Sequence, residues 1–125
     1  MLLEITHVET GYGKKPVLFD VSMEINQGEI VSIIGPNGAG KSTVLKAVCG
    51  LLPAWKGDIA LAGKRITGST PAKNVSRGMT FCPQGNRVFH GLTVKENLQI
   101  GGFRLQKREM QSRIDDNLSI FPRLK

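Results

Sequence analysis

The feature that most constrains this sequence is a glycine-rich octapeptide between an apolar run and an amphipathic stretch. Gly35 to Ser42 reads GPNGAGKS and directly follows the apolar run EIVSII at Glu29 to Ile34. A short run rich in Ile and Val favours a strand buried on both faces, which is typical of the centre of an α/β sheet. Ser42 to Cys49 carries apolar residues at helical spacing, and Gly50 follows where a helix C-terminus favours glycine. The sequence therefore predicts strand, loop and helix in succession, within an α/β fold.

The octapeptide fits the pattern G-x-x-x-x-G-K-[ST], whose glycines let backbone N–H groups turn toward phosphate oxygens. A bulky residue at Gly38 or Gly40 is expected to occupy the place of the phosphate. Lys41 brings a positive charge to the β- and γ-phosphates, and Ser42 offers its hydroxyl to Mg²⁺. The N-terminal N–H groups and the dipole of the following helix favour the same anion.

These residue types predict a site for ATP and Mg²⁺, with Ser42 as a metal ligand and Lys41 as a catalytic residue as well as a phosphate contact. A glycine-rich turn with a purely structural role is disfavoured, because the match lies after a predicted strand and before a predicted helix. The predicted nucleotide contacts of the loop are Gly35, Pro36, Asn37, Gly38, Ala39, Gly40, Lys41, Ser42 and Thr43.

Ahead of the loop, the sequence predicts a β-hairpin. Leu2 to Thr10 and Val17 to Ile25 both combine alternating apolar residues with β-branched ones, and Gly11 to Gly13 punctuates the gap between them. Three weaker elements are expected after the loop: strands at Asp58 to Leu61 and at Met79 to Cys82, and a helical stretch at Pro71 to Arg77.

Two helices are predicted near the C-terminus. Thr93 and Glu96 form a capping-box pattern, so a helix should begin there and run to about Ile100. A second, amphipathic helix should end at Phe121-Pro122. Its apolar face is formed by Leu105, Met110, Ile114 and Leu118.

Composition excludes several classes of protein. With 40% hydrophobic and 22% charged residues, the 125-residue chain resembles a soluble globular domain, and no apolar run approaches the roughly 20 residues that span a bilayer. The N-terminus lacks a secretory signal, so we expect a cytoplasmic protein. Cys49 and Cys82 are expected to be buried, reduced thiols.

The net charge of +7 does not indicate a nucleic-acid partner, because the lysines are dispersed and no aromatic residues interleave with them. We expect a solvated basic surface and no nucleic acid. The lysines in question are Lys14, Lys15, Lys64, Lys73 and Lys95.

Three motifs in order give the chain a family resemblance. Tyr12 in GYG, the loop GPNGAGKST, and Gln84 in FCPQG together resemble the nucleotide-binding subunits of ABC transporters. Over essentially its whole length, the chain is similar to the smaller of the two ATPase subunits of branched-chain amino-acid importers. It departs from the usual family choices at Cys82, Asn86, His90 and Lys95, none of which is an expected nucleotide contact.

The resemblance implies roles for two further residues. Tyr12 matches the aromatic residue that stacks on adenine, although local packing in the turn is an alternative role for it. Gln84 matches the glutamine that binds Mg²⁺ and the attacking water, which makes it an expected metal ligand and catalytic residue. Cys82 and His90 are assigned no role, since a lone cysteine or histidine is usually structural or solvated.

The resemblance also implies the fold and its organisation. We expect one ABC ATPase nucleotide-binding domain: a P-loop NTPase core with an antiparallel β subdomain in residues 1–92, and the start of the helical subdomain in residues 93–125. The family's Walker B Asp-Glu, LSGGQ signature and switch histidine do not occur in the sequence. We therefore expect a truncated domain that does not hydrolyse ATP alone, with an uncovered apolar face beside Val31 and Ile33 and a tendency to self-associate.

As a full-length family member, the protein is expected to be an ATPase that pairs with a second ABC ATPase subunit. It would lie at the cytoplasmic face of the plasma membrane, bind membrane permease subunits through the segment from Gln84 to Leu118, and depend indirectly on a periplasmic amino-acid-binding protein. The ATPase of a lipid or glycolipid exporter, and a non-catalytic nucleotide-binding fragment, remain alternatives. A GTPase is disfavoured because no N-K-x-D motif occurs.

Overall fold

The computed structural model describes residues 1–85 and 87–124, so Asn86, one of the departures noted above, lies outside the described residues. The chain divides into two compact units, Met1–Cys82 and Pro83–Lys125. The sequence placed an internal boundary between residues 92 and 93, which stays a prediction. Each unit is described by itself.

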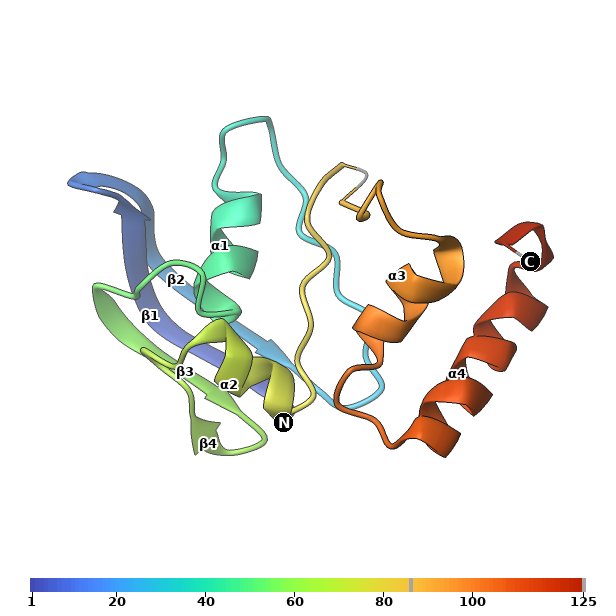
Figure 1. Ribbon diagram of the computed structural model, residues 1–125. Coiled ribbons are helices and arrows are strands. Elements are labelled where there is room, and N and C mark those ends of the chain that lie inside the picture. The colour runs from blue at the N-terminus through green and yellow to red at the C-terminus, as the bar shows by residue number, and fades with distance from the viewer. Residues whose placement is uncertain (86, 125) are drawn as a thin grey trace. The chain divides into compact units, whose positions relative to one another are not determined.

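The first unit is built on an antiparallel sheet in the strand order β2-β1-β3-β4 (Figure 1). Both strands of the predicted hairpin and the predicted strand at Asp58 to Leu61 are confirmed, each slightly longer than expected. The fourth strand was not predicted, because two residues carry too little pattern. The bounds are β1 Leu3–Tyr12, β2 Lys15–Ile25, β3 Lys56–Leu61 and β4 Lys64–Arg65.

The hairpin between β1 and β2 fixes the backbone of Tyr12. Tyr12 pairs with Lys15, so Gly13 and Lys14 form a two-residue turn, and Gly13 has the positive φ of 60° that such turns require. Gly11 pairs with Pro16, and a Cβ at Gly11 would collide with the backbone carbonyl of Lys15. The glycines of GYG therefore let the two strands close tightly, and Tyr12 lies at the end of β1.

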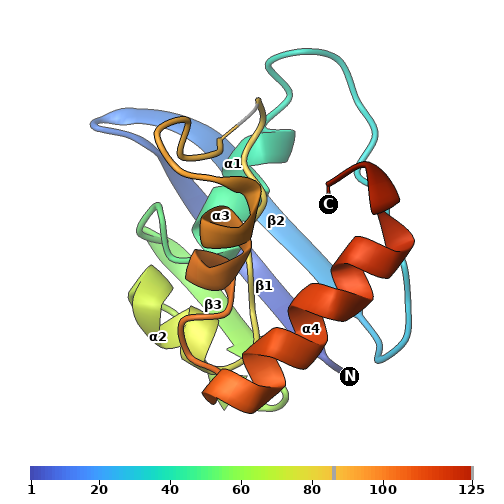
Figure 2. The same cartoon turned by 45° about the vertical axis from the view of Figure 1, so that its right-hand side comes forward.

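One face of the sheet is covered by α1 (Lys41–Val48), which lies against β1 and β2 (Figures 1 and 2). The helix and its C-terminal glycine are confirmed: Gly50 has a φ of 80°, and Gly50 N and Leu51 N donate to the carbonyls of Ala47 and Lys46. The core between helix and sheet consists of Ile5, Val8, Leu18, Val44, Val48, Ile59 and Ile66.

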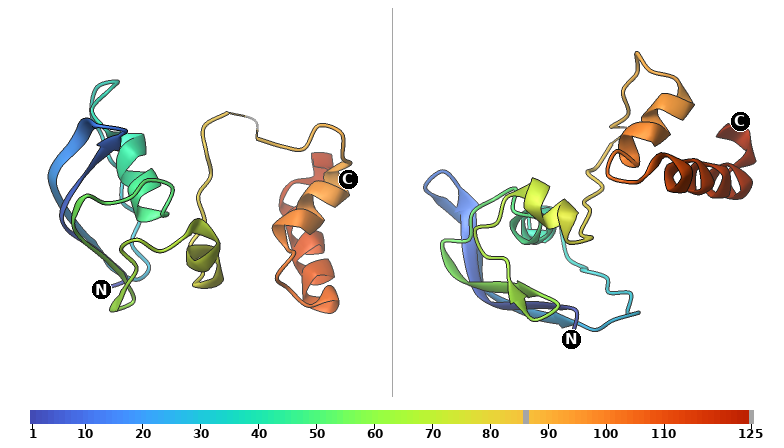
Figure 3. Two further views of the ribbon diagram at one scale, coloured as in Figure 1. Left: turned by 60° about the vertical axis from the view of Figure 1, so that its left-hand side comes forward. Right: turned by 60° about the horizontal axis from the view of Figure 1, so that its bottom comes forward.

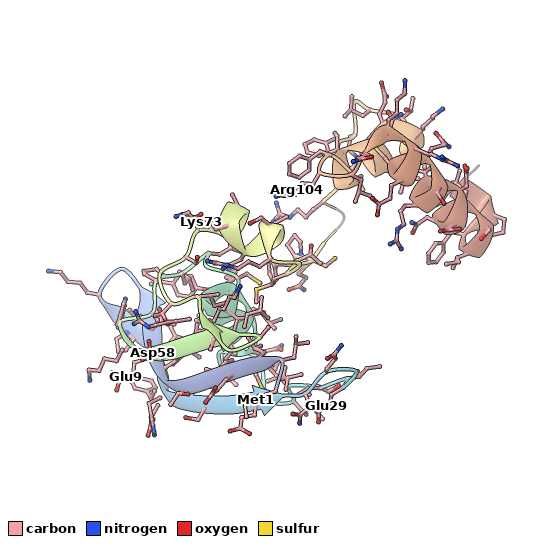
Figure 4. The ribbon with its side chains drawn as sticks, turned by 90° about the horizontal axis from the view of Figure 1, so that it is seen from below. Met1, Glu9, Glu29, Asp58, Lys73 and Arg104 are labelled. Carbon is pink, nitrogen blue, oxygen red and sulfur yellow. The ribbon has the colours of Figure 1, made fainter. Side chains whose placement is uncertain are left out.

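The predicted strand at Glu29 to Ile34 is wrong: the segment forms no ladder with any described residue. Figure 3 shows its backbone leaving the end of β2 as an unpaired trace, with Glu29 labelled beyond that end in Figure 4. Ile30 and Ile34 are 96% and 92% exposed. A strand buried on both faces needs neighbouring strands and covering helices, and the described residues supply neither for Ile30 and Ile34. Val31 and Ile33, beside which an uncovered apolar face was predicted, are 41% and 37% exposed.

The second strand prediction in this unit is also wrong, since Met79 to Cys82 has no strand partner among the described residues. The preceding helix is confirmed as α2 (Pro71–Ser76), with proline in its first turn and Thr70 Oγ1 accepting a hydrogen bond from Lys73 N. Both cysteines are free thiols, but only Cys49 is half-buried and Cys82 is exposed. The expectation of buried thiols fails for Cys82 because its segment is not part of a sheet.

The second unit contains α3 (Val94–Gly101), α4 (Lys107–Ile120) and a 3₁₀ turn, η1 (Pro122–Leu124). Both predicted helices are confirmed, but Leu105, expected on the apolar face of the second helix, lies ahead of α4, whose N-cap is Gln106. Ile114 is the buried residue of the amphipathic face of α4. Asn97 ties the preceding loop to α3, because its side chain bonds Phe89 N and the carbonyls of Phe89, Leu92 and Thr93. In the part of the chain that the structure describes, no helix has the length and apolar character needed to cross a membrane.

The predicted capping box at the start of α3 is confirmed and gives the second unit a pH dependence. Thr93 N and Oγ1 donate to Glu96 Oε2 over 2.8 and 2.7 Å, and Glu96 N donates to Thr93 Oγ1 over 3.2 Å. The two hydrogen bonds from Thr93 lower the pKa of Glu96 below its ordinary value of 4.5. A carboxyl group with a lowered pKa stabilises the fold above its ordinary pKa and loses that contribution as the pH falls through the folded value.

We therefore expect Glu96→Ala to lower the melting temperature at neutral pH, with a difference from the unmodified chain that shrinks as the pH falls below about 4.5. Thermal unfolding followed by circular dichroism across this pH range measures the difference. Asp116→Ala removes an exposed carboxylate of the same unit and serves as the control. A melting-temperature difference that is the same at every pH would contradict the capping role.

Candidate phosphate-binding site

The glycine-rich loop leads into the N-terminus of α1, as predicted. Ala39 N donates to Pro36 O over 3.2 Å, and Gly40 is the N-cap residue, whose carbonyl accepts from Thr43 N and Val44 N. Gly38 and Gly40 both have positive φ, 86° and 89°, which side-chain-bearing residues rarely adopt. The loop conformation therefore requires glycine at both positions, whether or not an anion is bound.

The physical reason for Gly40 differs from the one given by the sequence. A Cβ at Gly40 would lie 2.8 Å from Leu18 Cδ2, so it would point into the packing against β2. A Cβ at Gly38 would meet nothing within 4 Å. Gly40 is thus required by the contact between loop and sheet, and the expectation that a side chain there would fill the place of the phosphate is corrected. Sequence reasoning could not find this, because Leu18 is distant in the chain.

The ammonium group of Lys41 lies against the backbone of the glycine-rich loop. Its Nζ donates to the carbonyl oxygens of Gly35 and Pro36, each over 2.7 Å, so the side chain folds back across the loop from the first residue of α1. Ser42 follows in the first turn of the helix and is exposed. The loop therefore presents an ammonium group, a hydroxyl and the N–H groups of a helix N-terminus, which together suit an anion and an accompanying cation.

Tyr12 is joined to the same helix by two side chains. Its hydroxyl oxygen lies 3.5 Å from Thr43 Oγ1 and accepts a hydrogen bond from Lys46 Nζ over 3.2 Å. Hydrogen bonds from Thr43 and from Lys46 lower the pKa of the Tyr12 hydroxyl, and the charge of Lys46 adds to this effect. Tyr12, which is predicted to stack on the adenine base, therefore lies close to Thr43, which is a predicted nucleotide contact of the phosphate loop.

Sequence reasoning missed Lys46. It is separated from Tyr12 by 34 residues, and a lysine on a helix carries no local signal of such a contact. The helical spacing of Thr43 and Lys46 does predict that they share one face of α1, but only the packing of α1 on the hairpin shows that this face meets Tyr12.

A mainly apolar groove of about 250 Å³ adjoins the loop, and Lys41 and Ser42 are among the residues that line it. Val31 and Ile33 line it together with residues of α1, β1 and β2, so the apolar face expected beside these two residues faces this groove. Its mainly apolar lining does not suit a triphosphate.

Gln84 belongs to the second unit and is exposed. Its predicted roles as a metal ligand and a catalytic residue stay predictions, as do those of the loop residues. Among the described residues, no group of three or more histidine, cysteine or acidic side chains is arranged to hold a metal ion.

Comparison with known proteins decides the family. Residues 18–124 match the sequence profile of the family described as ABC transporter. This chain belongs to that family. The ABC assignment covers the loop, α1, and both helices of the second unit, and the family resemblance seen in the sequence is confirmed.

Curated relatives of this ABC chain include two from branched-chain amino-acid transport. It is 44% identical to the high-affinity branched-chain amino acid transport ATP-binding protein BraG of Pseudomonas aeruginosa, over 99% of this chain and 53% of the relative. It is 39% identical to the probable branched-chain amino acid transport ATP-binding protein LivF of Archaeoglobus fulgidus, over 99% of this chain and 52% of the relative. The ABC chain therefore spans about half the length of these relatives.

The fold of the ABC chain resembles that of a solved ATP-binding subunit of an ABC transporter. The TM-score is 0.81 at 31% sequence identity, covering 95% of this chain and 50% of the other. The predicted fold class, an incomplete P-loop NTPase core with an antiparallel β subdomain and the start of the ABC helical subdomain, is confirmed.

Proposed function

We propose that this chain is the N-terminal, nucleotide-binding part of an ATP-binding subunit of an ABC importer for branched-chain amino acids. The observation that carries the proposal is the loop at the N-terminus of α1, where Lys41 Nζ is bonded to the carbonyls of Gly35 and Pro36. Similarity to the BraG and LivF proteins over 99% of the chain supports the choice of importer.

In the proposed site, each group recognises one part of Mg²⁺-ATP. The ammonium of Lys41 binds the β- and γ-phosphates, because it is already held at the loop that surrounds them. Backbone N–H groups of the loop and of the first turn of α1 bind phosphate oxygens, and the hydroxyl of Ser42 ligates Mg²⁺. The ring of Tyr12, which is 45% exposed, stacks on the adenine base. The metal ion would neutralise phosphate charge when bound.

In the full-length protein, we propose that ATP is hydrolysed in a pair with a second ABC ATPase subunit, with Gln84 binding Mg²⁺ and the attacking water. This pair would work at the cytoplasmic face of the plasma membrane, with permease subunits and, indirectly, a periplasmic amino-acid-binding protein. The chain of 125 residues contains no Walker B Asp-Glu, so we expect it to bind ATP without hydrolysing it.

An apolar groove in the second unit supports contact with a membrane subunit. The loop before α3, the helix itself and η1 form a groove whose apolar lining residues are Val88, Phe89, Leu92, Val94, Leu98 and Leu124. Phe89 and Val88 are both more than half exposed, and Asn97 holds this loop to α3. An ordered apolar groove of this kind suits an amphipathic helix of a partner, and we propose the cytoplasmic helix of a permease subunit as that partner.

The proposal is tested at two levels. Titration calorimetry of the unmodified chain with Mg²⁺-ATP should give saturable heat and no release of phosphate, and the absence of heat would contradict an autonomous binding site. The transported substrate is tested in cells: disruption of the gene that encodes this protein should abolish the uptake of labelled leucine. Normal leucine uptake with an altered lipid composition of the membrane would instead favour an exporter of lipids.

A further inference from the structure

We propose that Lys46 is a positioning residue for the nucleotide base, which acts by holding the ring of Tyr12 at its hydroxyl edge. The inference rests on the proposed ATP-binding function and extends it to a residue of α1 outside the phosphate loop. Lys46 Nζ lies 3.2 Å from the hydroxyl oxygen of Tyr12 and 5.3 Å from the centre of its ring. The ammonium therefore contacts the hydroxyl end of the ring.

This placement keeps the aromatic face available. A cation centred above the ring would compete with a base for the same π-surface, whereas a donor at the hydroxyl leaves room for stacking. Tyr12 retains 45% exposure in this arrangement. The contact therefore restrains the ring without covering it, which is what a stacking platform requires.

The hydroxyl of Tyr12 is held by two residues on one face of α1. Thr43 Oγ1 lies 3.5 Å from it, and Lys46 follows Thr43 by three residues, which places both side chains on the same side of the helix. Thr43 is itself buried and is the third residue of α1, directly after the glycine-rich loop. The orientation of the predicted base platform is thereby coupled to the helix that carries the predicted phosphate site.

Restraint of the ring matters because Tyr12 lies next to a hairpin turn. The pairing of Tyr12 with Lys15 fixes its backbone, but its side chain remains free to rotate unless the hydroxyl is bonded. Ordering a side chain only when the ligand binds subtracts from affinity, whereas a ring ordered in advance avoids that cost. Of the two residues that contact the Tyr12 hydroxyl, Lys46 is the charged donor, so its removal should lower the affinity for ATP more than removal of Thr43 Oγ1.

The first test compares two ligands, Mg²⁺-ATP and Mg²⁺-tripolyphosphate, on the unmodified chain and on Lys46→Met. Calorimetry should show an affinity for ATP lowered by about threefold to tenfold and an affinity for tripolyphosphate unchanged, because tripolyphosphate has no base to stack. Tyr12→Phe keeps the ring but loses the acceptor, and should match Lys46→Met. The double variant should lose no more than either single one, and Lys46→Arg should restore affinity for ATP.

If Lys46→Met lowers the affinity for both ligands equally, Lys46 contacts the phosphates and does not position the base. If Lys46→Met changes neither affinity, Lys46 has no role in binding. Each result overturns the proposal. If the unmodified chain binds neither ligand, the proposed function fails and the proposal fails with it.

The second test needs no ligand. Tyr12 is the single tyrosine of the chain, so the near-ultraviolet absorbance of phenolate reports on this residue alone. Hydrogen bonds from Thr43 and Lys46 lower the pKa of Tyr12, so Lys46→Met should shift the absorbance titration to higher pH. A titration curve unchanged by Lys46→Met would contradict the contact on which the proposal depends, independently of whether the chain binds ATP.

Discussion

Lys41→Met is expected to lower the affinity of the chain for Mg²⁺-ATP by about 100-fold or more. Lys41 Nζ is bonded to the carbonyls of Gly35 and Pro36 over 2.7 Å each, which holds the ammonium where the loop turns. Two charge-assisted hydrogen bonds to phosphate oxygens contribute roughly 3 kcal/mol in total, and about 1.4 kcal/mol corresponds to a tenfold change. Methionine keeps the apolar stem of the side chain but removes the charge and both donors.

Calorimetry with Mg²⁺-ATP and with Mg²⁺-tripolyphosphate measures this loss, which should be equally large for the two ligands because Lys41 is assigned to the phosphates. Lys73→Met removes an exposed lysine of α2 from the same unit and controls for net charge. Melting temperatures show whether each variant folds. An affinity for ATP that survives Lys41→Met unchanged, in a variant that melts normally, would show that the phosphate contact has been assigned to the wrong residue.

Local features of the fold were predictable from sequence because their causes lie within a few residues. The capping box needs only Thr93 and Glu96, three positions apart, and the structure shows both of its hydrogen bonds. Gly50 ends α1 in the left-handed conformation that the pattern predicts. The hairpin follows from alternation on either side of Gly11 to Gly13. The phosphate loop, likewise, was identified from eight consecutive residues.

Features that depend on distant partners were not predictable in the same way. The apolar run at Glu29 to Ile34 has the composition of a central strand, but pairing is a property of neighbouring strands, and none among the described residues pairs with it. Cys82 is exposed for the same reason. The contact of Lys46 with Tyr12 joins a helix to a hairpin across 34 residues. The roles of Tyr12 and Gln84 came from family resemblance, because neither residue carries a chemical signal by itself.

The unpaired segment leads to the second large effect that we expect: the chain should associate with a second copy through residues 29–34. Ile30 and Ile34 are almost fully exposed, and the run from Ile30 to Ile34 contains no charge. Unpaired N–H and C=O groups in an extended, β-branched and uncharged run favour pairing with another chain. Light scattering after size exclusion should therefore give a mass that rises with protein concentration.

Ile30→Lys combined with Ile34→Lys should shift this equilibrium strongly toward the monomer, because edge lysines prevent strand pairing. Leu51→Lys combined with Val75→Lys adds the same charge at exposed apolar residues outside the segment and should leave the association nearly unchanged. An unmodified chain that is monomeric at every concentration tested would contradict the prediction. Equal dissociation by both double variants would show that net charge, and not this segment, controls the association.

Side chains alternate between the two sides of residues 29–34, which explains why dissociation should require substitutions at Ile30 and Ile34. Val31 and Ile33 line the groove beside α1 and are 41% and 37% exposed, so one side of the segment is already partly covered. Residues two apart share a side of an extended chain, which places Ile30 and Ile34 together on the other side. Lysines at these two positions therefore change the open side while leaving the groove intact, and Mg²⁺-ATP binding at the loop should persist in the monomeric variant.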